Sequence, residues 1–114
     1  MKKQNKFEEL LLHNKVVDHR NLYVILSRKR FIVPSFTIMV MGLYKEKLVF
    51  FKISTSYRVI KFIEDIEIKT IQEFNIKTKK VNPLLNIIIN KKVYKYDLIE
   101  NIKDIYSIKK NIGK

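Results

Sequence analysis

The sequence predicts a mainly β domain of the α+β class: a small antiparallel barrel or sandwich of about seven strands with a helix near each end of the chain. Short apolar and aromatic runs alternate with polar turns, which is typical of antiparallel strands. Apolar residues at helical spacing mark the C-terminal part. A length of 114 residues with 46% hydrophobic residues suits one packed core, so we expect a single domain over 1–114.

The clearest strand pair lies within residues 43–53, LYKEKLVFFKI. The charged residues Lys45, Glu46 and Lys47 separate two apolar runs, and this pattern is a hairpin signal. The run over 48–51 is apolar without alternation. We therefore expect its strand to be buried on both faces or to lie at the centre of the sheet.

The first residues, 1–15, predict a short helix over 5–14. His13 near its end suits the helix dipole, which favours a cation at the C-terminus. One face of this helix carries its apolar residues, Phe7, Leu10 and Leu11.

Residues 16–30 fit two structures. One is a second amphipathic helix, and the other is a loop followed by a strand over 22–26. The β-branched and aromatic residues of that segment favour the strand.

Further strands are predicted at 36–43, 57–63, 69–78, 84–89 and 93–96. The residues of 69–78 that should share one face are Thr70, Gln72, Phe74, Ile76 and Thr78. Between two strands lies an acidic segment, which we expect to be a solvated corner: Glu64, Asp65 and Glu67. Asn90, Lys91 and Lys92 indicate a second hairpin turn.

A C-terminal helix is predicted over 97–112. Asp97 is a candidate N-cap with Glu100 three residues later, as in a capping box, and Gly113 suits the helix end. Its apolar face is expected to consist of Leu98, Ile102, Ile105, Tyr106 and Ile112.

Two segments carry a family resemblance. The run GLYKEKLVFFKI at 42–53 resembles the G-L-T-x-K-R-L-hydrophobic-F-F hairpin of bacterial PH-like (pleckstrin-homology and GRAM-type) domains, although Tyr44 stands where Thr is frequent and Lys47 where Arg is common. The run RVIKFIEDIEIKTI at 58–71 resembles their strand, acidic corner and next strand. The resemblance covers residues 36–112 and implies a PH-like barrel plugged by the C-terminal helix.

The chain is strongly basic, with 24 Lys and Arg against 11 Asp and Glu and a formal net charge of +13. Such an excess favours nucleic acid, an anionic lipid surface or an acidic protein as partner. A composition rich in Lys, Ile and Asn is also typical of AT-rich coding genomes, and this background accounts for part of the charge.

PH domains bind anionic head groups through basic loops, and the resemblance implies the same for basic residues in or beside the predicted loops here. These candidate residues are Arg28, Lys29, Arg30, Lys45, Lys47, Lys79, Lys80, Lys91 and Lys92. The expected partner is an anionic membrane surface, at the inner face of the cytoplasmic membrane.

The residues give little support for catalysis. Cysteine is absent, which excludes disulfides and thiol chemistry. His13 and His19 are six residues apart and do not share a helical face, and Ser54, Thr55 and Ser56 have no histidine nearby in sequence. With glycine only at positions 42 and 113, no phosphate-binding loop is formed. We expect a monomer that is not an enzyme and holds no metal or cofactor.

No segment predicts a membrane span or a signal peptide. The N-terminal apolar run, residues 10–12, is too short for a signal peptide. The longest uncharged run, 31–44, is shorter than the roughly 20 residues that a spanning helix needs and contains Pro34.

Small basic PH-like proteins of Gram-positive bacteria resemble the self-immunity proteins of leaderless bacteriocins. The most concrete expectation is therefore self-immunity to a membrane-active bacteriocin. We expect the protein to act at the lipid surface and to form no direct complex with the cationic bacteriocin, because like charges repel. The alternatives are an adaptor that binds another protein, and non-specific nucleic-acid binding with bases stacked on the aromatic residues Tyr23, Tyr44, Tyr57 and Phe74.

Overall fold

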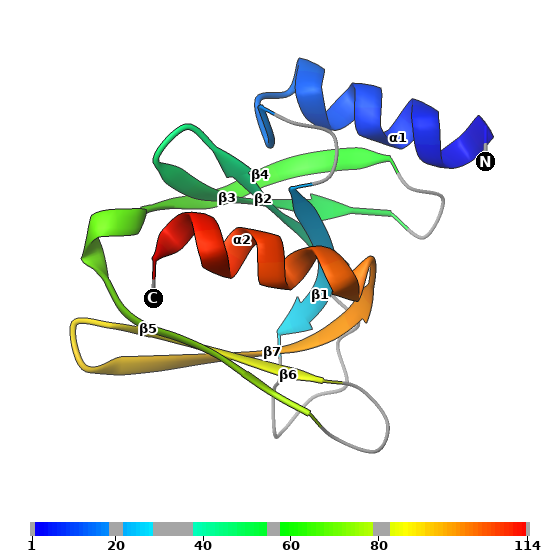
Figure 1. The fold of residues 1–114 in the computed structure, drawn as a ribbon. Helices are drawn as coiled ribbons and strands as arrows, with labels where there is room; N and C mark the ends of the chain where they lie inside the picture. The colour runs from blue at the N-terminus through cyan, green and yellow to red at the C-terminus, as the bar shows by residue number, and fades with distance from the viewer. Residues whose placement is uncertain (1, 19–21, 29–37, 55–57, 79–82, 114) are drawn as a thin grey trace.

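The computed structural model describes residues 2–18, 22–28, 38–54, 58–78 and 83–113. Its elements are α1 (Lys2–His13), β1 (Tyr23–Arg28), β2 (Ile38–Tyr44), β3 (Lys47–Ile53), β4 (Val59–Glu67), the 3₁₀ turn η1 (Ile68–Thr70), β5 (Ile71–Lys77), β6 (Leu84–Ile89), β7 (Lys92–Glu100), the 3₁₀ turn η2 (Ile102–Asp104) and α2 (Ile105–Ile112). The predicted class, a mainly β α+β fold with a helix near each end, is confirmed (Figure 1).

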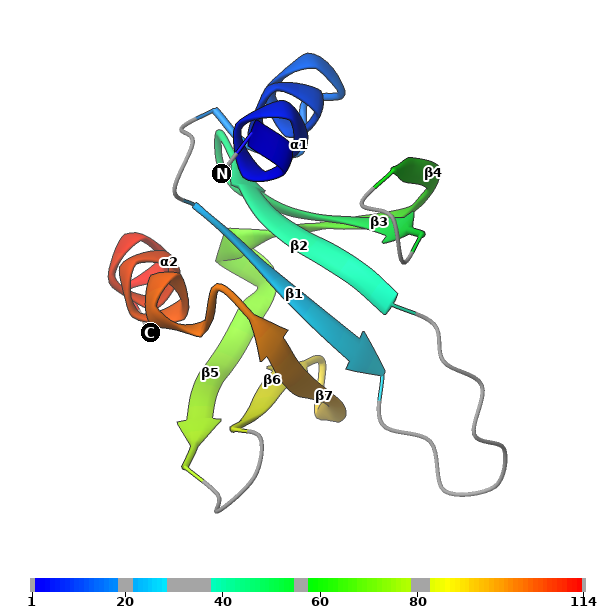
Figure 2. The same ribbon diagram turned by 90° about the vertical axis from the view of Figure 1, so that its right-hand side faces the viewer.

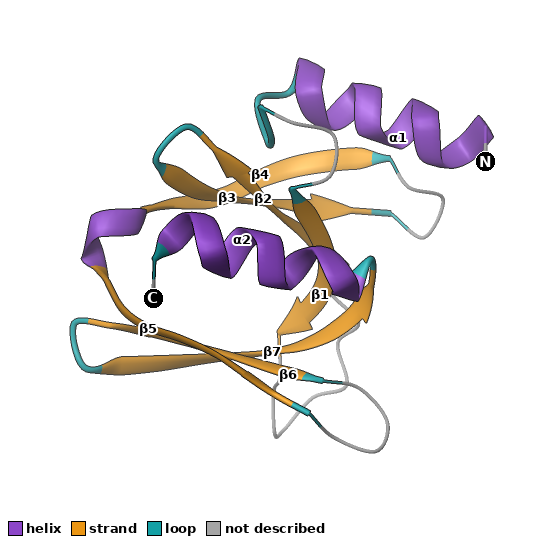
Figure 3. Ribbon diagram, in the orientation of Figure 1, coloured by secondary structure: helices purple, strands orange, loops and turns teal. Residues whose placement is uncertain are grey.

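All seven strands form one antiparallel sheet in the order β4-β3-β2-β1-β7-β6-β5. The sheet bends so that β2, β3 and β4 lie on one side of α2 and β5, β6 and β7 on the other (Figures 1 and 2). The two end strands, β4 and β5, do not pair with each other, so the sheet is open and the expected barrel is not closed. Helix α2 and the turn η1 occupy that side of the molecule instead (Figure 3).

The main core fills the bend of the sheet. Helix α2 contributes Ile105, Ile108 and Ile112, spaced by three and four residues so that they share one face. The strands contribute Val24, Leu26, Met39, Met41, Leu43, Leu48, Phe50, Ile71, Phe74, Leu85, Ile87, Tyr96 and Leu98. Phe50 stacks on Tyr96, with ring centroids 5.6 Å apart, and thereby joins the two halves of the sheet.

A second core covers the outer face of β1, β2 and β3. Phe7 and Leu11 of α1 pack there, and the Phe7 ring meets Tyr23 edge to face at 5.6 Å. The other buried members of this core are Val16, Val17, Ile25, Val40 and Ile53. Because side chains alternate along a strand, β1, β2 and β3 are buried on both faces.

The expected burial of residues 48–51 on both faces is therefore confirmed. Leu48 and Phe50 face the main core, while Phe51 packs against the second. The strand is not central, because β3 lies between β2 and the end strand β4.

Gly42 in β2 allows the segment after α1 to approach the sheet closely. A Cβ atom there would lie 2.4 Å from the Val16 carbonyl oxygen and 2.6 Å from Cγ1 of Val17. The same segment is held by the Asp18 carboxylate, which accepts a hydrogen bond from the backbone N–H of Lys45 at 2.7 Å. Glycine is thus required by the packing of a second layer on this strand.

The predicted start of the C-terminal helix is wrong. Residues 97–100 extend β7, where Asp97 pairs with Ser27 of β1 and Leu84 of β6. Pairing on two sides outweighs the local capping signal, because a central strand satisfies its backbone groups with both neighbours. The helix follows η2 and ends as predicted at Gly113, which has a φ of 77°.

The apolar face of that helix also differs from the prediction. Tyr106 is 57% exposed, whereas Ile108 is fully buried. The later start explains the difference: Leu98 and Ile102 lie outside the helix, so its buried face is centred on Ile105, Ile108 and Ile112.

Two further predictions are wrong in the middle of the chain. The acidic residues 64–67 are not a corner, because β4 continues through Glu67 and η1 makes the turn. The second wrong prediction placed Gln72 and Phe74 on one face of their strand. In β5 the register shifts between Ile71 and Glu73, so that Ile71 and Phe74 are both buried and Gln72 is exposed. An extra residue in a strand moves the following side chains to the other face, which simple alternation does not predict.

The strand interpretation of residues 22–26 is confirmed by β1, and α1 begins earlier than expected, at Lys2. The strand predicted at 84–89 coincides with β6.

Candidate functional site

The structure describes the side chains of four of the nine candidate basic residues. Lys45 and Lys47 lie at the turn between β2 and β3, and Lys91 and Lys92 at the turn between β6 and β7. Arg28 ends β1, but its side chain is not among those described. The other four candidates lie outside the described residues: Lys29, Arg30, Lys79 and Lys80.

The turn between β6 and β7 is a tight hairpin. Ile89 pairs with Lys92, and the two residues between them are both left-handed, with φ of 50° at Asn90 and 67° at Lys91. Asn is among the residues that adopt this conformation readily, and two successive left-handed residues characterise type I′ hairpins. The lysines at 91 and 92 are exposed.

The turn between β2 and β3 is equally short, but only the first of its two residues is left-handed. Tyr44 pairs with Lys47, and Lys45 between them has a φ of 55°. The Lys45 ammonium group lies 5.4 Å from the centre of the Tyr44 ring, a cation–π distance. Lys47 forms a long ion pair with Asp65 of β4, at 3.8 Å.

Turn η1 and Gln72, which follows it closely, are linked to the two hairpin turns by hydrogen bonds. The backbone N–H of Ile68 donates to the Glu46 carbonyl at 2.9 Å, and the Lys91 N–H donates to the side chain of Gln72, just after η1, at 2.8 Å. Both hairpin turns and η1 therefore lie on one side of the molecule (Figure 1). We call Lys45, Lys47, Lys69, Lys91 and Lys92 the turn lysines.

The charges on this side are mixed. Lys69 pairs with Glu67 at 3.4 Å, and both partners are exposed. Exposed pairs of this kind contribute about 0–1 kcal/mol to stability because water screens them. Within the described part of the chain, no ion pair forms at Lys45, Lys91 or Lys92.

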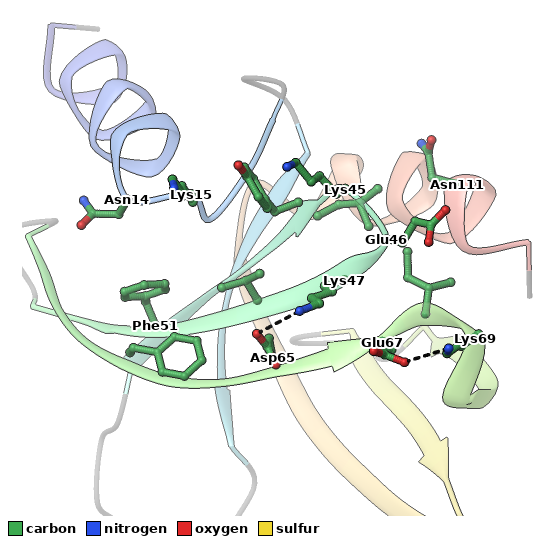
Figure 4. A pocket seen from close by; sticks show the side chains of 15 residues that line it. Asn14, Lys15, Lys45, Glu46, Lys47, Phe51, Asp65, Glu67, Lys69 and Asn111 are labelled. Atoms are coloured by element: carbon green, nitrogen blue, oxygen red, sulfur yellow. Dashed lines mark ion pairs between the residues drawn. The ribbon is translucent and has the colours of Figure 1, made fainter.

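Next to the first hairpin turn lies an open hollow of about 1110 Å³ (Figure 4). Val49, Phe51 and Phe62 form its apolar part, with the two phenylalanine rings edge to face at 5.4 Å. Lys15, two residues after the end of α1, and Lys45 border it, and acidic residues such as Asp65 and Glu67 also line it. This combination of aromatic rings and lysines was not predicted, because Phe51 and Phe62 meet only when β3 and β4 pair.

The structure describes only some of the residues weighed for catalysis. His13 ends α1, and His19 lies outside the described residues. Ser54 Oγ accepts a hydrogen bond from the Arg58 N–H at 3.1 Å, which closes the connection between β3 and β4. In the parts of the chain that the structure describes, no three His, Cys, Asp or Glu side chains are arranged to hold a metal ion.

Among the described helices, neither has the length and apolar character needed to cross a bilayer. Comparison with known proteins adds no relative: no family model matches this chain, and no significant match is found among curated proteins.

Proposed function

We propose that this chain is a non-enzymatic PH-like domain that binds the anionic inner surface of the cytoplasmic membrane. The strand number, the antiparallel order and the C-terminal helix agree with what the resemblance of residues 42–53 and 58–71 implies. The net charge of +13 supports an anionic partner.

The turn lysines are the observation that carries this proposal. Lys45 and Lys91 are exposed residues at the left-handed tips of their hairpins. A lysine near an anionic leaflet contributes about 1 kcal/mol to membrane attachment. Several lysines on one side are thus sufficient for reversible peripheral binding, which salt should weaken because it screens exposed charges.

A paired substitution tests the site. Replacing Lys91 and Lys92 together by glutamate should weaken binding to vesicles containing anionic lipid by at least about thirtyfold, since two lysines contribute about 2 kcal/mol. Co-sedimentation with neutral and anionic vesicles over a salt series measures the effect.

The matched control replaces Lys52 and Lys103 by glutamate. Both residues are exposed, neither belongs to the turn lysines, and the loss of charge is identical. Equal weakening in both variants would mean that overall charge, and not the hairpin turns, attracts the protein to lipid. Absence of binding to anionic vesicles at low salt would rule out the proposal.

Self-immunity to a membrane-active bacteriocin is the finer form of the proposal, and it rests on the resemblance. A cationic protein spread over the inner leaflet competes with a cationic peptide for anionic lipid. Expression in a sensitive strain should raise the tolerated peptide concentration, and the Lys91 and Lys92 double variant should lose that protection together with lipid binding. A stable stoichiometric complex with the peptide would contradict competition at the surface.

A further inference from the structure

The end strand β4 combines a free edge with exposed apolar side chains. Among the described strands it pairs only with β3. Phe62 is 49% exposed and Ile63 is 39% exposed, and both lie in the middle of the strand. Edge strands with exposed apolar residues readily pair with another strand, because their outward N–H and C=O groups lack partners. Figure 2 shows β4 at the rim of its half of the sheet.

The charge pattern of this segment is complementary to itself. Residues 58–67 read RVIKFIEDIE, with basic residues at 58 and 61 and acidic residues at 64, 65 and 67. When two copies run antiparallel about a twofold axis between Phe62 and Ile63, Lys61 of each copy is opposite Glu64 of the other. Opposite charges directly across a strand pair stabilise it.

A bulge makes this register possible. Phe50 of β3 pairs with Glu64 and Phe51 pairs with Phe62, so Ile63 is an extra residue in β4. Lys61 pairs with Lys52, which lies on the same face of β3 as Phe50. Lys61 and Glu64 therefore share one face of β4 although they are three residues apart. In a twofold pair the residues opposite each other must share a face, which an unbulged strand would not allow for positions 61 and 64.

We propose that β4 is a self-association edge at which a second copy of this chain pairs antiparallel, centred on Phe62 and Ile63. The occupant is another copy because Lys61 and Glu64 of one chain match Glu64 and Lys61 of the other in charge, on either side of the axis, as an isologous interface requires. The dimer is a weak one. A second register shift, at Ile60, bends the strand and keeps the paired ladder short, and the net charge of +13 on each copy opposes association.

Single charge reversals test the pairing. Lys61→Glu places like charges opposite each other twice across the axis, and it should weaken dimerisation at least about tenfold. Glu64→Lys should do the same. Both side chains are exposed, so neither change removes a core contact. Sedimentation equilibrium over a concentration series measures the mass, which should rise from 13.7 kDa toward twice that value for the unaltered chain.

Two rescue experiments distinguish pairing from a general effect of charge. The double variant Lys61→Glu with Glu64→Lys restores complementarity with the signs exchanged, and it should dimerise as the unaltered chain does. An equimolar mixture of the two single variants should form a heterodimer, detected by native mass spectrometry, although each alone dimerises poorly. Lys103→Glu, which removes the same charge away from β4, should leave dimerisation unchanged.

Several outcomes would overturn the proposal. One is a mass of 13.7 kDa at every soluble concentration of the unaltered chain. Another is dimerisation that Lys61→Glu does not weaken, and a third is failure of the charge-exchanged double variant to recover. Because these measurements contain no lipid, they are independent of the vesicle experiments.

Discussion

At the scale of single residues, the two glycines act in different ways. Gly42 has no room for a side chain, because the Val16 carbonyl and the Val17 side chain occupy the space above it. Gly113 has open space around it, but its φ of 77° is one that residues with a Cβ adopt only at a cost. The first glycine thus serves packing of one layer on another, and the second serves helix termination.

Substitution of each glycine by alanine should separate these effects. Gly42→Ala should lower the free energy of unfolding by about 3 kcal/mol, the upper part of the range for overpacking, because backbone must move. Gly113→Ala should cost about 1 kcal/mol, from backbone strain alone. Urea unfolding measures both values, and an equal or smaller loss for Gly42→Ala would contradict the close approach of residues 16 and 17.

At the scale of elements, the junction between β7 and α2 depends on Asn101. Its φ of 58° is left-handed, and this conformation turns the chain out of the strand toward η2. The side-chain amide donates to the Tyr23 carbonyl at 2.8 Å and to the Asp104 carboxylate at 2.6 Å. Asn101 therefore ties the start of β1 to the approach of α2, and it decides where the helix can begin.

Substitutions at Asn101 should resolve its two contributions. Asn101→Ala loses both hydrogen bonds and places a residue with a Cβ in the left-handed region, so we expect a loss of about 3 kcal/mol. Asn101→Gly loses the hydrogen bonds but relieves the backbone, and it should cost about 1 kcal/mol less. Thermal or urea unfolding compares the variants. Equal losses would mean that the left-handed backbone contributes nothing.

At the scale of the whole molecule, positive and negative charges lie close together. Lys47 and Lys69 of the turn lysines form ion pairs with Asp65 and Glu67 in the second half of β4. Lipid binding through the turn lysines should weaken with salt, because it depends on attraction between exposed charges. The dimer through β4 forms against the mutual repulsion of two basic proteins, which salt screens. The two proposed contacts are therefore distinguished by how they respond to salt.

Much of this structure was determined locally by the sequence itself. The hairpin turns at Lys45 and at Asn90 and Lys91, the apolar strands and the helix end at Gly113 depend on residues close in sequence. Turn conformation and alternation of apolar residues act over a few positions, so the sequence predicts them. The basic character of the candidate site is likewise a property of composition.

Other features depend on pairing between distant segments. Only the partner strands reveal the extra residues at Ile60 and Ile63, the shift after Ile71 and the extension of β7 to Glu100. The opposite charges of Lys61 and Glu64 are visible in the sequence, but their proposed role depends on β4 lying at the end of the sheet. The bend of the sheet around α2 decides which lysines lie on the same side of the molecule. The local conformational preferences of the residues determine the helices, strands and turns. The register of each strand and its neighbours in the sheet are set by the burial and backbone hydrogen bonds that only the assembled sheet provides.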